Sequence, residues 1–295
     1  MPYLGEIFAL ITAIWWTGSS MAFTAATKRV GSVYVNVMRM ILAMLILAPI
    51  VLVAGGLQNV KGDQLLYLSL SGFVGFVFGD SFLFKAFETI GARISMVIMA
   101  FAPALTALLA YIFLGETLSL LGFLGMIITL FGIGMVVLDG NRSEQSGHTS
   151  LAGVLWAFLA TLGQAGGYIL TKAAFNCGAI GGIEATFIRV LAGTILLVPL
   201  NYLLGYFRHP VRVFREKPEA MKYTVLGAVL GPVLGVTFSL LAVSMTKVAI
   251  ASTLIATTPI FMLPAVRFIY HERLSWQAIA GAIFAVGGIV LLFML

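Results

Sequence analysis

The chain has 295 residues, of which 61% are hydrophobic and only 9% are charged. Soluble domains average about 25% charged residues, so this composition excludes a soluble globule built around one large core. The formal net charge of +6 does not indicate nucleic-acid binding. The basic residues lie mostly between apolar segments, where they orient a membrane protein. The single cysteine, Cys177, excludes an internal disulfide.

Ten apolar segments follow one another along the chain. Each is long enough to cross a hydrocarbon core of about 30 Å as a helix. They lie at 4–26, 33–54, 65–86, 94–114, 118–138, 151–172, 184–206, 223–244, 250–270 and 275–295. Residues 1–26 lack a basic leader, so we expect a first span there rather than a cleavable signal. Residues 139–150 predict a polar linker, and residues 207–222 predict a basic, proline-containing loop.

The second half of the sequence repeats the first. A shift of 156 positions, without a gap, places Gly75, Gly79, Pro103, Glu116, Gly125 and Gly132 on Gly231, Gly235, Pro259, Glu272, Gly281 and Gly288. Because each half has five spans, the second half enters the membrane upside down, and inverted repeats place a cavity at their interface. The sequence therefore predicts an all-α membrane protein with ten transmembrane helices. They form two inverted five-helix repeats, residues 1–138 and 151–295, joined by the linker 139–150 around a central cavity.

Glycines and prolines recur at matching places in the two halves. Gly75 and Gly79 are one helical turn apart, as are the glycines of the eighth span, and such spacing lets helix backbones approach closely in lipid. This indicates either a moving contact between the halves or static packing. Pro103 and Pro259 predict mid-helix kinks, whose free carbonyls either line a cavity or are purely structural.

The basic residues of the loops are unevenly distributed. Loops after even-numbered spans hold Lys61, Lys172 and Lys247, whereas loops after odd-numbered spans hold Lys28, Arg29, Lys85, Arg93, Arg142, Arg208, Arg212, Arg215, Lys217, Lys222, Arg267 and Arg273. The positive-inside rule then predicts that the odd-span loops are cytoplasmic and that both termini are outside.

Residues that break the repeat are candidates for substrate contact, because a substrate is not itself two-fold symmetric. Asp80 meets Val236 in the second half and lies about 22 Å into its span at about 1.5 Å per residue. An acid at that depth is costly, so it is a candidate to carry a coupling proton or to bind a cationic group. The alternative is a salt bridge to Lys85 or to a neighbouring helix. Glu88 shares the helix face of Asp80 and is a gate candidate or an interfacial anchor.

Two arginines occupy equivalent positions when the first repeat is shifted by 150, namely Arg39 and Arg189. Both lie about six residues inside their spans, which is within reach of the lipid headgroups. We expect either structural arginines that reach the headgroups or a pair of gates, one on each face. Glu116 and Glu272 begin the turns before the fifth and tenth spans, where a carboxylate favours the N-terminus of the following helix.

Mixed aromatic and polar faces predict a small-molecule pocket. Gln164 and Tyr168 share one face of the sixth span, Trp16 and Ser19 form a similar patch on the first, and Thr257 lies on the ninth. The alternative for any one of them is packing within the bundle, with the hydroxyls bonded to their own helix. Together with Asp80, these residues are the predicted substrate-binding set.

No catalytic, metal-binding or cofactor-binding motif occurs in the sequence. Phe78-Gly79-Asp80 resembles part of the intramembrane aspartyl protease signature. The other aspartates, Asp63 and Asp139, lie in predicted loops, so a two-carboxylate mechanism lacks its second acid. We expect no enzyme, no cofactor and no ATP-driven transport within this chain.

The two five-span repeats, Pro103 and Pro259, and the glycines of the fifth and tenth spans resemble the drug/metabolite transporter superfamily, in its ten-helix EamA-like branch. Trp16-Thr17-Gly18-Ser19 is similar to the family's first-span pattern, and His271 departs from the glycine usual before Glu272. The resemblance implies an alternating-access carrier of small metabolites, in many cases an exporter of amino acids or related compounds. It also implies cytoplasmic termini, opposite to the loop charges.

We therefore predict a multi-pass carrier of the cell (inner) membrane. Its partners would be a small-molecule substrate, membrane lipid and protons as the coupling ion. The alternatives are a nucleotide-sugar or sugar-phosphate exchanger, for which Arg39, Arg189 and Lys172 are the deep cations, and a membrane channel or receptor.

Overall fold

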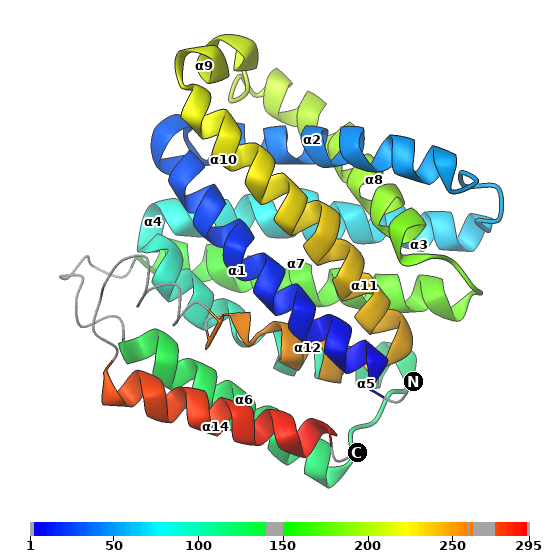
Figure 1. Ribbon diagram of the computed structural model, residues 1–295, viewed down its shortest axis with the longest axis vertical. Coiled ribbons are helices and arrows are strands. Elements are labelled where there is room, and N and C mark those ends of the chain that lie inside the picture. Colours follow the sequence, from blue (N-terminus) through cyan, green and yellow to red (C-terminus); the bar gives the residue numbers. More distant parts are fainter. Residues whose placement is uncertain (1–2, 140–149, 259, 262–274, 294–295) are drawn as a thin grey trace.

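The computed structural model describes residues 3–139, 150–258, 260–261 and 275–293, and within these ranges it contains helices and no strand (Figure 1). In the first half the elements are α1 (Leu4–Val30), α2 (Ser32–Val53), α3 (Gly62–Gly72), η1 (Phe73–Gly79), α4 (Asp80–Met99), α5 (Ala102–Leu114) and α6 (Leu120–Asp139). In the second half they are α7 (Leu151–Asn176), α8 (Gly182–Leu203), α9 (Pro210–Glu216), α10 (Pro218–Ala228), η3 (Val229–Gly235), α11 (Val236–Met245), α12 (Val248–Ile255) and α14 (Trp276–Phe293).

Six helices in the described ranges are long and apolar enough to cross a membrane. They are Leu4–Val30, Ser32–Val53, Gly62–Ala86, Leu151–Asn176, Gly182–Leu203 and Pro218–Met245. Shorter apolar helices lie at Ala102–Leu114, Leu120–Met135 and Ile279–Leu291. The all-helical membrane architecture is therefore confirmed, whereas the count of ten spans stays a prediction.

Two π-helical segments interrupt the third and eighth predicted spans at matching positions. Phe73–Gly79 and Val229–Gly235 are related by the repeat shift of 156 residues, and each ends at a glycine. A π-turn adds a residue to the helical turn and is found frequently at functional sites. The sequence analysis did not predict these segments, because apolar periodicity does not separate a π-turn from an α-turn.

The fourth and ninth predicted spans contain breaks at matching positions rather than simple kinks. α4 ends at Met99, residues 100–101 form a turn, and α5 begins with Pro103 in its first turn. α12 ends at Ile255 before a turn at 256–257, and Pro259 lies outside the described residues. The prediction of one continuous, kinked helix over 94–114 was therefore wrong. A proline inside a helix costs a backbone hydrogen bond, whereas a proline in the first turn does not, so ending α4 before Pro103 avoids that loss.

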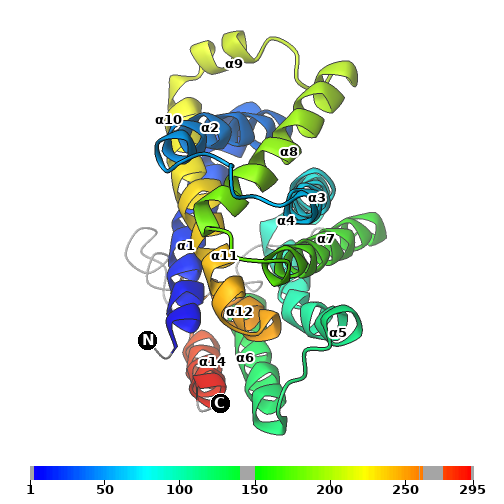
Figure 2. The ribbon, with the colours of Figure 1, turned by 90° about the vertical axis from the view of Figure 1, so that its right-hand side faces the viewer.

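Two predicted connections also differ from the structure. Residues 87–93, expected between the third and fourth spans, have helical backbone within α4. Residues 207–222, expected as a loop, contain α9 and the start of α10 (Figure 2). Pro210 and Pro218 occupy the first turns of these helices, where a proline is well suited because its φ angle is already helical.

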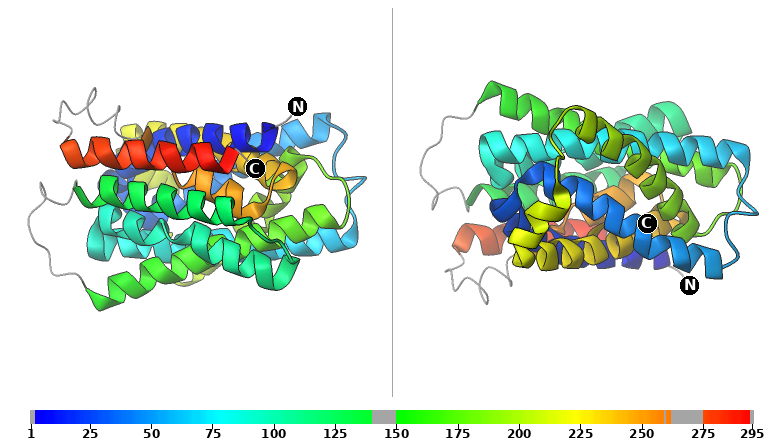
Figure 3. Two further views of the ribbon diagram at one scale, coloured as in Figure 1. Left: turned by 90° about the horizontal axis from the view of Figure 1, so that it is seen from below. Right: turned by 90° about the horizontal axis from the view of Figure 1, so that it is seen from above.

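The two halves pack by exchanging their first helices. α1 lies along α10, η3 and α11 of the second half, and α7 lies along α3, η1 and α4 of the first. Repeat-related helices also contact each other directly, as α2 does with α8 and α5 with α12. The start of α1 and the end of α14 lie at the same end of the bundle (Figure 3). Helices at equivalent positions of the two sequence repeats therefore make equivalent contacts with the opposite half.

α6 and α14 lie side by side and form the outer edge of the bundle (Figures 1 and 2). A Cβ on Gly132 would lie 2.4 Å from the Gly281 carbonyl oxygen, and one on Gly288 would lie 2.5 Å from the backbone nitrogen of Thr129. Repeat-related glycines therefore let these two helices approach until their backbones touch, as small residues do in lipid.

Candidate functional site

Arg39 on α2 and Asp80 at the start of α4 form an ion pair inside the bundle. The Arg39 side chain is 11% exposed and that of Asp80 is 20% exposed. The Nε atom of Arg39 donates to Asn36 Oδ1 at 3.0 Å, and the guanidinium carbon lies 5.3 Å from the ring centroid of Phe23 and 5.2 Å from that of Phe84. The charge of Arg39 is therefore compensated within its own half.

For Asp80, one alternative was a salt bridge to a neighbouring helix, and its ion pair with Arg39 of α2 is such a bridge. Lys85 is exposed and is not the partner. The side chain of Glu88 lies outside the described residues, so its gate role stays a prediction.

Arg189 on α8, the repeat mate of Arg39, has no such ion pair, although Asp80, which is already paired with Arg39, lies within electrostatic range of it. It is 5% exposed, and among the described residues its guanidinium makes no hydrogen bond and no ion pair. The guanidinium carbon lies 5.0 Å from the centroid of the Phe76 ring. A Cβ on Gly75 would lie 3.1 Å from its Nη2 atom, so this glycine leaves room for the side chain. The repeat mate of Asp80 is Val236, so the second half has no acid at the matching position.

Tyr168 on α7 is 3% exposed, and its hydroxyl also has no hydrogen-bond partner. The hydroxyl lies near Ser239 and within electrostatic range of Arg189 and Asp80. Gln164 lies half-buried one turn earlier on the same helix. The structure therefore brings Tyr168 together with Arg189, which the sequence analysis had placed in separate groups of candidates.

Trp16 and Ser19 on α1 pack against η3 and α10. Ser19 Oγ donates to the Gly227 carbonyl at 3.1 Å. A Cβ on Gly231 would lie 2.4 Å from Ser19 Oγ, and one on Gly235 would lie 2.4 Å from Trp16 Nε1. These contacts fit the packing alternative for Ser19, and its role in binding stays a prediction.

Thr257 lies in the turn after α12 and is 1% exposed. Its hydroxyl donates to the Leu254 carbonyl of its own helix at 2.6 Å. This is the back-bonding that the packing alternative describes.

The exchanged helices each donate a hydroxyl to a carbonyl at a helix break. Thr17 Oγ1 on α1 shares its proton between the Thr258 carbonyl at 3.1 Å and the Ala13 carbonyl of its own helix at 2.9 Å. Thr161 Oγ1 on α7 likewise shares its proton between the Ile98 carbonyl at 3.4 Å and the Ala157 carbonyl at 2.7 Å. Carbonyls at a helix break lack their i+4 amide partner. The Ile98 carbonyl accepts from the Phe101 amide at 3.0 Å instead, and the Thr161 hydroxyl adds a second, longer contact. Neither threonine was predicted to contact another helix, because a threonine in an apolar helix most often bonds only its own backbone.

A polar cluster closes the end of the bundle where α5, α7, α11 and α12 meet. Lys172 Nζ donates to the carbonyls of Val243 at 2.8 Å and Thr246 at 2.9 Å, and Glu116 Oε2 accepts from the Val248 amide at 2.9 Å. Glu116 and Lys172 lie 3.8 Å apart. Each charge thus lies at the helix end that its sign favours, lysine at the C-terminus of α11 and glutamate at the N-terminus of α12.

The prediction that the Glu116 carboxylate stabilises a helix N-terminus was right, but the prediction that this helix is the next one in the chain was wrong. The carboxylate caps α12 of the other half rather than α6, because the chain over residues 115–119 passes the start of α12. Glu272, its repeat mate, lies outside the described residues.

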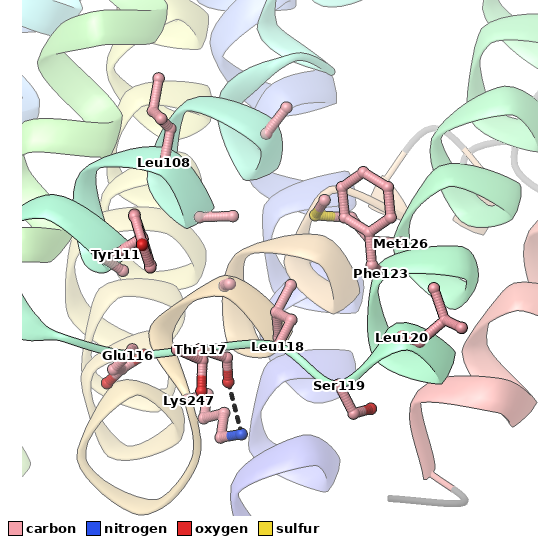
Figure 4. A pocket seen from close by; sticks show the side chains of 14 residues that line it. Leu108, Tyr111, Glu116, Thr117, Leu118, Ser119, Leu120, Phe123, Met126 and Lys247 are labelled. Atoms are coloured by element: carbon pink, nitrogen blue, oxygen red, sulfur yellow. Dashed lines mark hydrogen bonds between the residues drawn. The ribbon is translucent and has the colours of Figure 1, made fainter.

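A groove of about 540 Å³ lies between α5, the 115–119 segment, α6 and α12 (Figure 4). Leu108, Tyr111 and Phe123 give it apolar walls, and Lys247 donates to the Thr117 carbonyl at 2.7 Å along its floor. None of the predicted substrate-binding residues lines this groove. In the described part of the chain, no three histidine, cysteine or acidic residues lie close enough together to hold a metal ion.

The profile of the EamA-like transporter family matches residues 3–138 and 151–294. The chain belongs to the EamA-like transporter family. This confirms the resemblance drawn from its repeats, prolines and glycines. The family is one of transporters, and the six helices long and apolar enough to span a membrane agree with a multi-pass membrane protein.

Curated relatives of this EamA protein are distant. "Putative ribose uptake protein RbsU" of Staphylococcus epidermidis is 27% identical over 164 residues, 54% of each chain. "Solute carrier family 35 member G1" of Mus musculus is 28% identical over 196 residues, 58% of this chain and 51% of the relative. The chain thus spans about half the length of the curated relatives it matches.

A crystal structure of another protein matches over 97% of this chain and 94% of that chain, with a TM-score of 0.78 at 16% identity. At that identity the likeness shows the fold alone.

Proposed function

We propose that this EamA protein is a secondary carrier that moves a small metabolite by alternating access. The exchange of α1 and α7 between the halves supports this most directly. In this proposal the two halves are inverted with respect to each other and rock around a shared central cavity. The matching π-segments and helix breaks support it further, since both halves then have the same non-ideal elements beside the interface.

The cavity would be lined by Trp16, Gln164, Tyr168 and Thr257, with Ser19 and Asp80 at its margin. α1 and α7, which hold most of this set, are the helices that contact the opposite half. The polar cluster of Glu116 and Lys172 would close one end of the pathway, since it links the 115–119 segment of the first half to α7 and α12 of the second. Arg39 would stabilise its own half through Asp80 rather than act as a gate.

The charges favour a small metabolite over a nucleotide sugar. A nucleotide sugar needs several free cations, whereas Arg39 is paired with Asp80 and Lys172 is bound to two carbonyls and Glu116. An amino acid or related compound, which has few charges, fits a site with few free cations. We further propose that the carrier lies in the cell (inner) membrane and that it exports its substrate. A coupling proton on Asp80 remains part of the proposal.

Counterflow in liposomes tests the carrier. Purified protein is reconstituted into liposomes preloaded with unlabelled L-alanine, lactate or ribose, and uptake of the same labelled solute is followed. A carrier gives saturable uptake that the preloaded solute accelerates. Flux that rises linearly with concentration and ignores the preload identifies a channel and overturns the proposal. Protein-free liposomes supply the background rate.

A further inference from the structure

We propose that Arg189 and Tyr168 bind the carboxylate of the transported substrate. This rests on the proposed carrier function and adds the substrate's chemical class. Among the described residues, four buried side-chain atoms lack a hydrogen-bond partner, and they are Trp15 Nε1, Thr106 Oγ1, Tyr168 OH and Arg189 Nε. Two of the four belong to residues within electrostatic range of each other, and both are hydrogen-bond donors.

A buried guanidinium without an anion is costly, because desolvation of the charge is not offset by a partner. Arg189 retains only 5% of its surface and has an aromatic face, Phe76, on one side. A Cβ on Gly75 or Gly167 would approach its Nη2 atom to 3.1 or 3.4 Å, so bare backbone surrounds it. The unused donors of Arg189 and Tyr168 suit an acceptor group that reaches them when the halves move.

Arg39 provides an internal comparison. It occupies the equivalent place in the first half, and there the anion is supplied by the protein as Asp80. In the second half that position is Val236, which cannot compensate a charge. The substrate carboxylate would therefore form with Arg189 the ion pair that the Asp80 carboxylate forms with Arg39.

The single positive charge that Arg189 offers favours a substrate with one negative charge. Arg189 offers one positive charge in a fork that suits two carboxylate oxygens, and Tyr168 offers one hydroxyl. A phosphate ester or a nucleotide carries more negative charge than this pair compensates. A neutral sugar would leave the guanidinium uncompensated.

Two measurements on the purified full-length protein test this. The first is counterflow and ligand-induced thermal stabilisation with lactate and L-alanine, their amides lactamide and L-alaninamide, ribose, and glycerol 3-phosphate. We expect a response to at least one carboxylate and none to its amide. Arg189→Gln should weaken that response by about 100-fold, since it removes one partner of a buried charge pair. Tyr168→Phe should weaken it less, because the ion pair remains.

The second measurement compares the melting temperatures of two variants, first without ligand and then with the carboxylates. Val236→Asp places a carboxylate where the repeat puts Asp80, and Val236→Asn has nearly the same shape without the charge. We expect the Asp variant to melt above the Asn variant and to lose the carboxylate response, because its own anion occupies Arg189.

The outcomes separate this inference from the carrier function. Saturable counterflow that is equal for acid and amide, or unchanged in Arg189→Gln, overturns the carboxylate site and leaves the carrier standing. Counterflow of ribose or glycerol 3-phosphate alone does the same. An Asp variant that melts below the Asn variant shows that Arg189 is not free and overturns the inference whatever is transported. Absence of saturable counterflow by every solute counts against the carrier, and absence of any carboxylate-dependent stabilisation then removes the site as well.

Discussion

The Cα atom of Gly79 lies 2.6 Å from the place that a Cβ would take on Gly163, so η1 and α7 touch through their backbones. We expect Gly163→Ala to force these elements apart and to cost about 1–3 kcal/mol of stability, the usual range for overpacking. Thermal unfolding in detergent measures the effect. Gly134→Ala on α6 is the matched control, because nothing lies within 4 Å of its added methyl. The control should keep or raise stability by up to about 1 kcal/mol, and equal melting of both variants would contradict the prediction.

Asp80→Ala should leave Arg39 buried without its anion. Removal of one partner from a buried pair costs about 3–5 kcal/mol, and partial exposure of the carboxylate reduces this to about 2–3 kcal/mol. Arg39→Met combined with Asp80→Ala should recover part of the loss, since no charge then remains unpaired. Chemical unfolding of these two variants and of Arg39→Met alone gives the coupling energy. Additive effects of the two substitutions would show that the pair contributes nothing.

The proposed coupling role of Asp80 has a separate test. Asp80→Asn keeps the shape of the side chain and removes its titratable proton. If Asp80 carries the coupling proton, this variant should lose the pH dependence of transport while counterflow, which needs no proton gradient, persists. An unchanged pH profile in liposomes would exclude Asp80 as the coupling group.

Glu116→Gln should weaken the polar cluster that joins the halves. The substitution removes the negative charge at the N-terminus of α12 and the partner of Lys172, and a helix-terminal charge contributes about 0.3–2 kcal/mol. We expect a lower melting temperature and, because the cluster links the two halves, faster counterflow if its opening limits the cycle. Glu6→Gln is a useful comparison, because Glu6 accepts a bond from the Thr246 hydroxyl at 2.6 Å and does not contact Lys172. A larger effect from Glu6→Gln would argue against the role of Glu116.

The side of the membrane on which each end lies is open to a direct test. Val53, at the end of α2, is 90% exposed, and Val211, on α9, is 78% exposed. In a Cys177→Ser background, the loop charges predict that Val53→Cys reacts with a membrane-impermeant maleimide in intact cells. Val211→Cys should then react only after permeabilisation. The reverse pattern would place the termini in the cytoplasm, as the family resemblance implies.

The all-helical fold and the repeat could be predicted from the sequence, because the length of each apolar segment and the matching glycines of the two halves can be read directly from the residues. Gly132 and Gly288 are examples, since both mark a contact of α6 with α14. Helix boundaries were less predictable. Pro103 marked the right place, but its position in the first turn of α5 rather than mid-helix depends on where the preceding helix ends.

The candidate site was only partly predictable. The asymmetry of Asp80 and Val236 was visible in the sequence, and in the structure Arg39 is paired with Asp80 whereas Arg189 has no ion pair among the described residues. The partner itself was not visible, because Arg39 and Asp80 are 41 residues apart and meet only through the packing of α2 against α4. The same holds for Glu116, which caps a helix that lies 132 residues further along the chain.

The exchanged packing of α1 also has a consequence for biosynthesis. Ser19 is bonded to a carbonyl that lies 208 residues later in the chain. At about 5–20 residues per second, a ribosome needs roughly 10–40 s to make that partner. During this interval the newly inserted first helix must present its threonines and serines to lipid or to the insertion machinery. Substitutions on the buried face of α1 should therefore affect the yield of membrane-inserted protein before they affect transport.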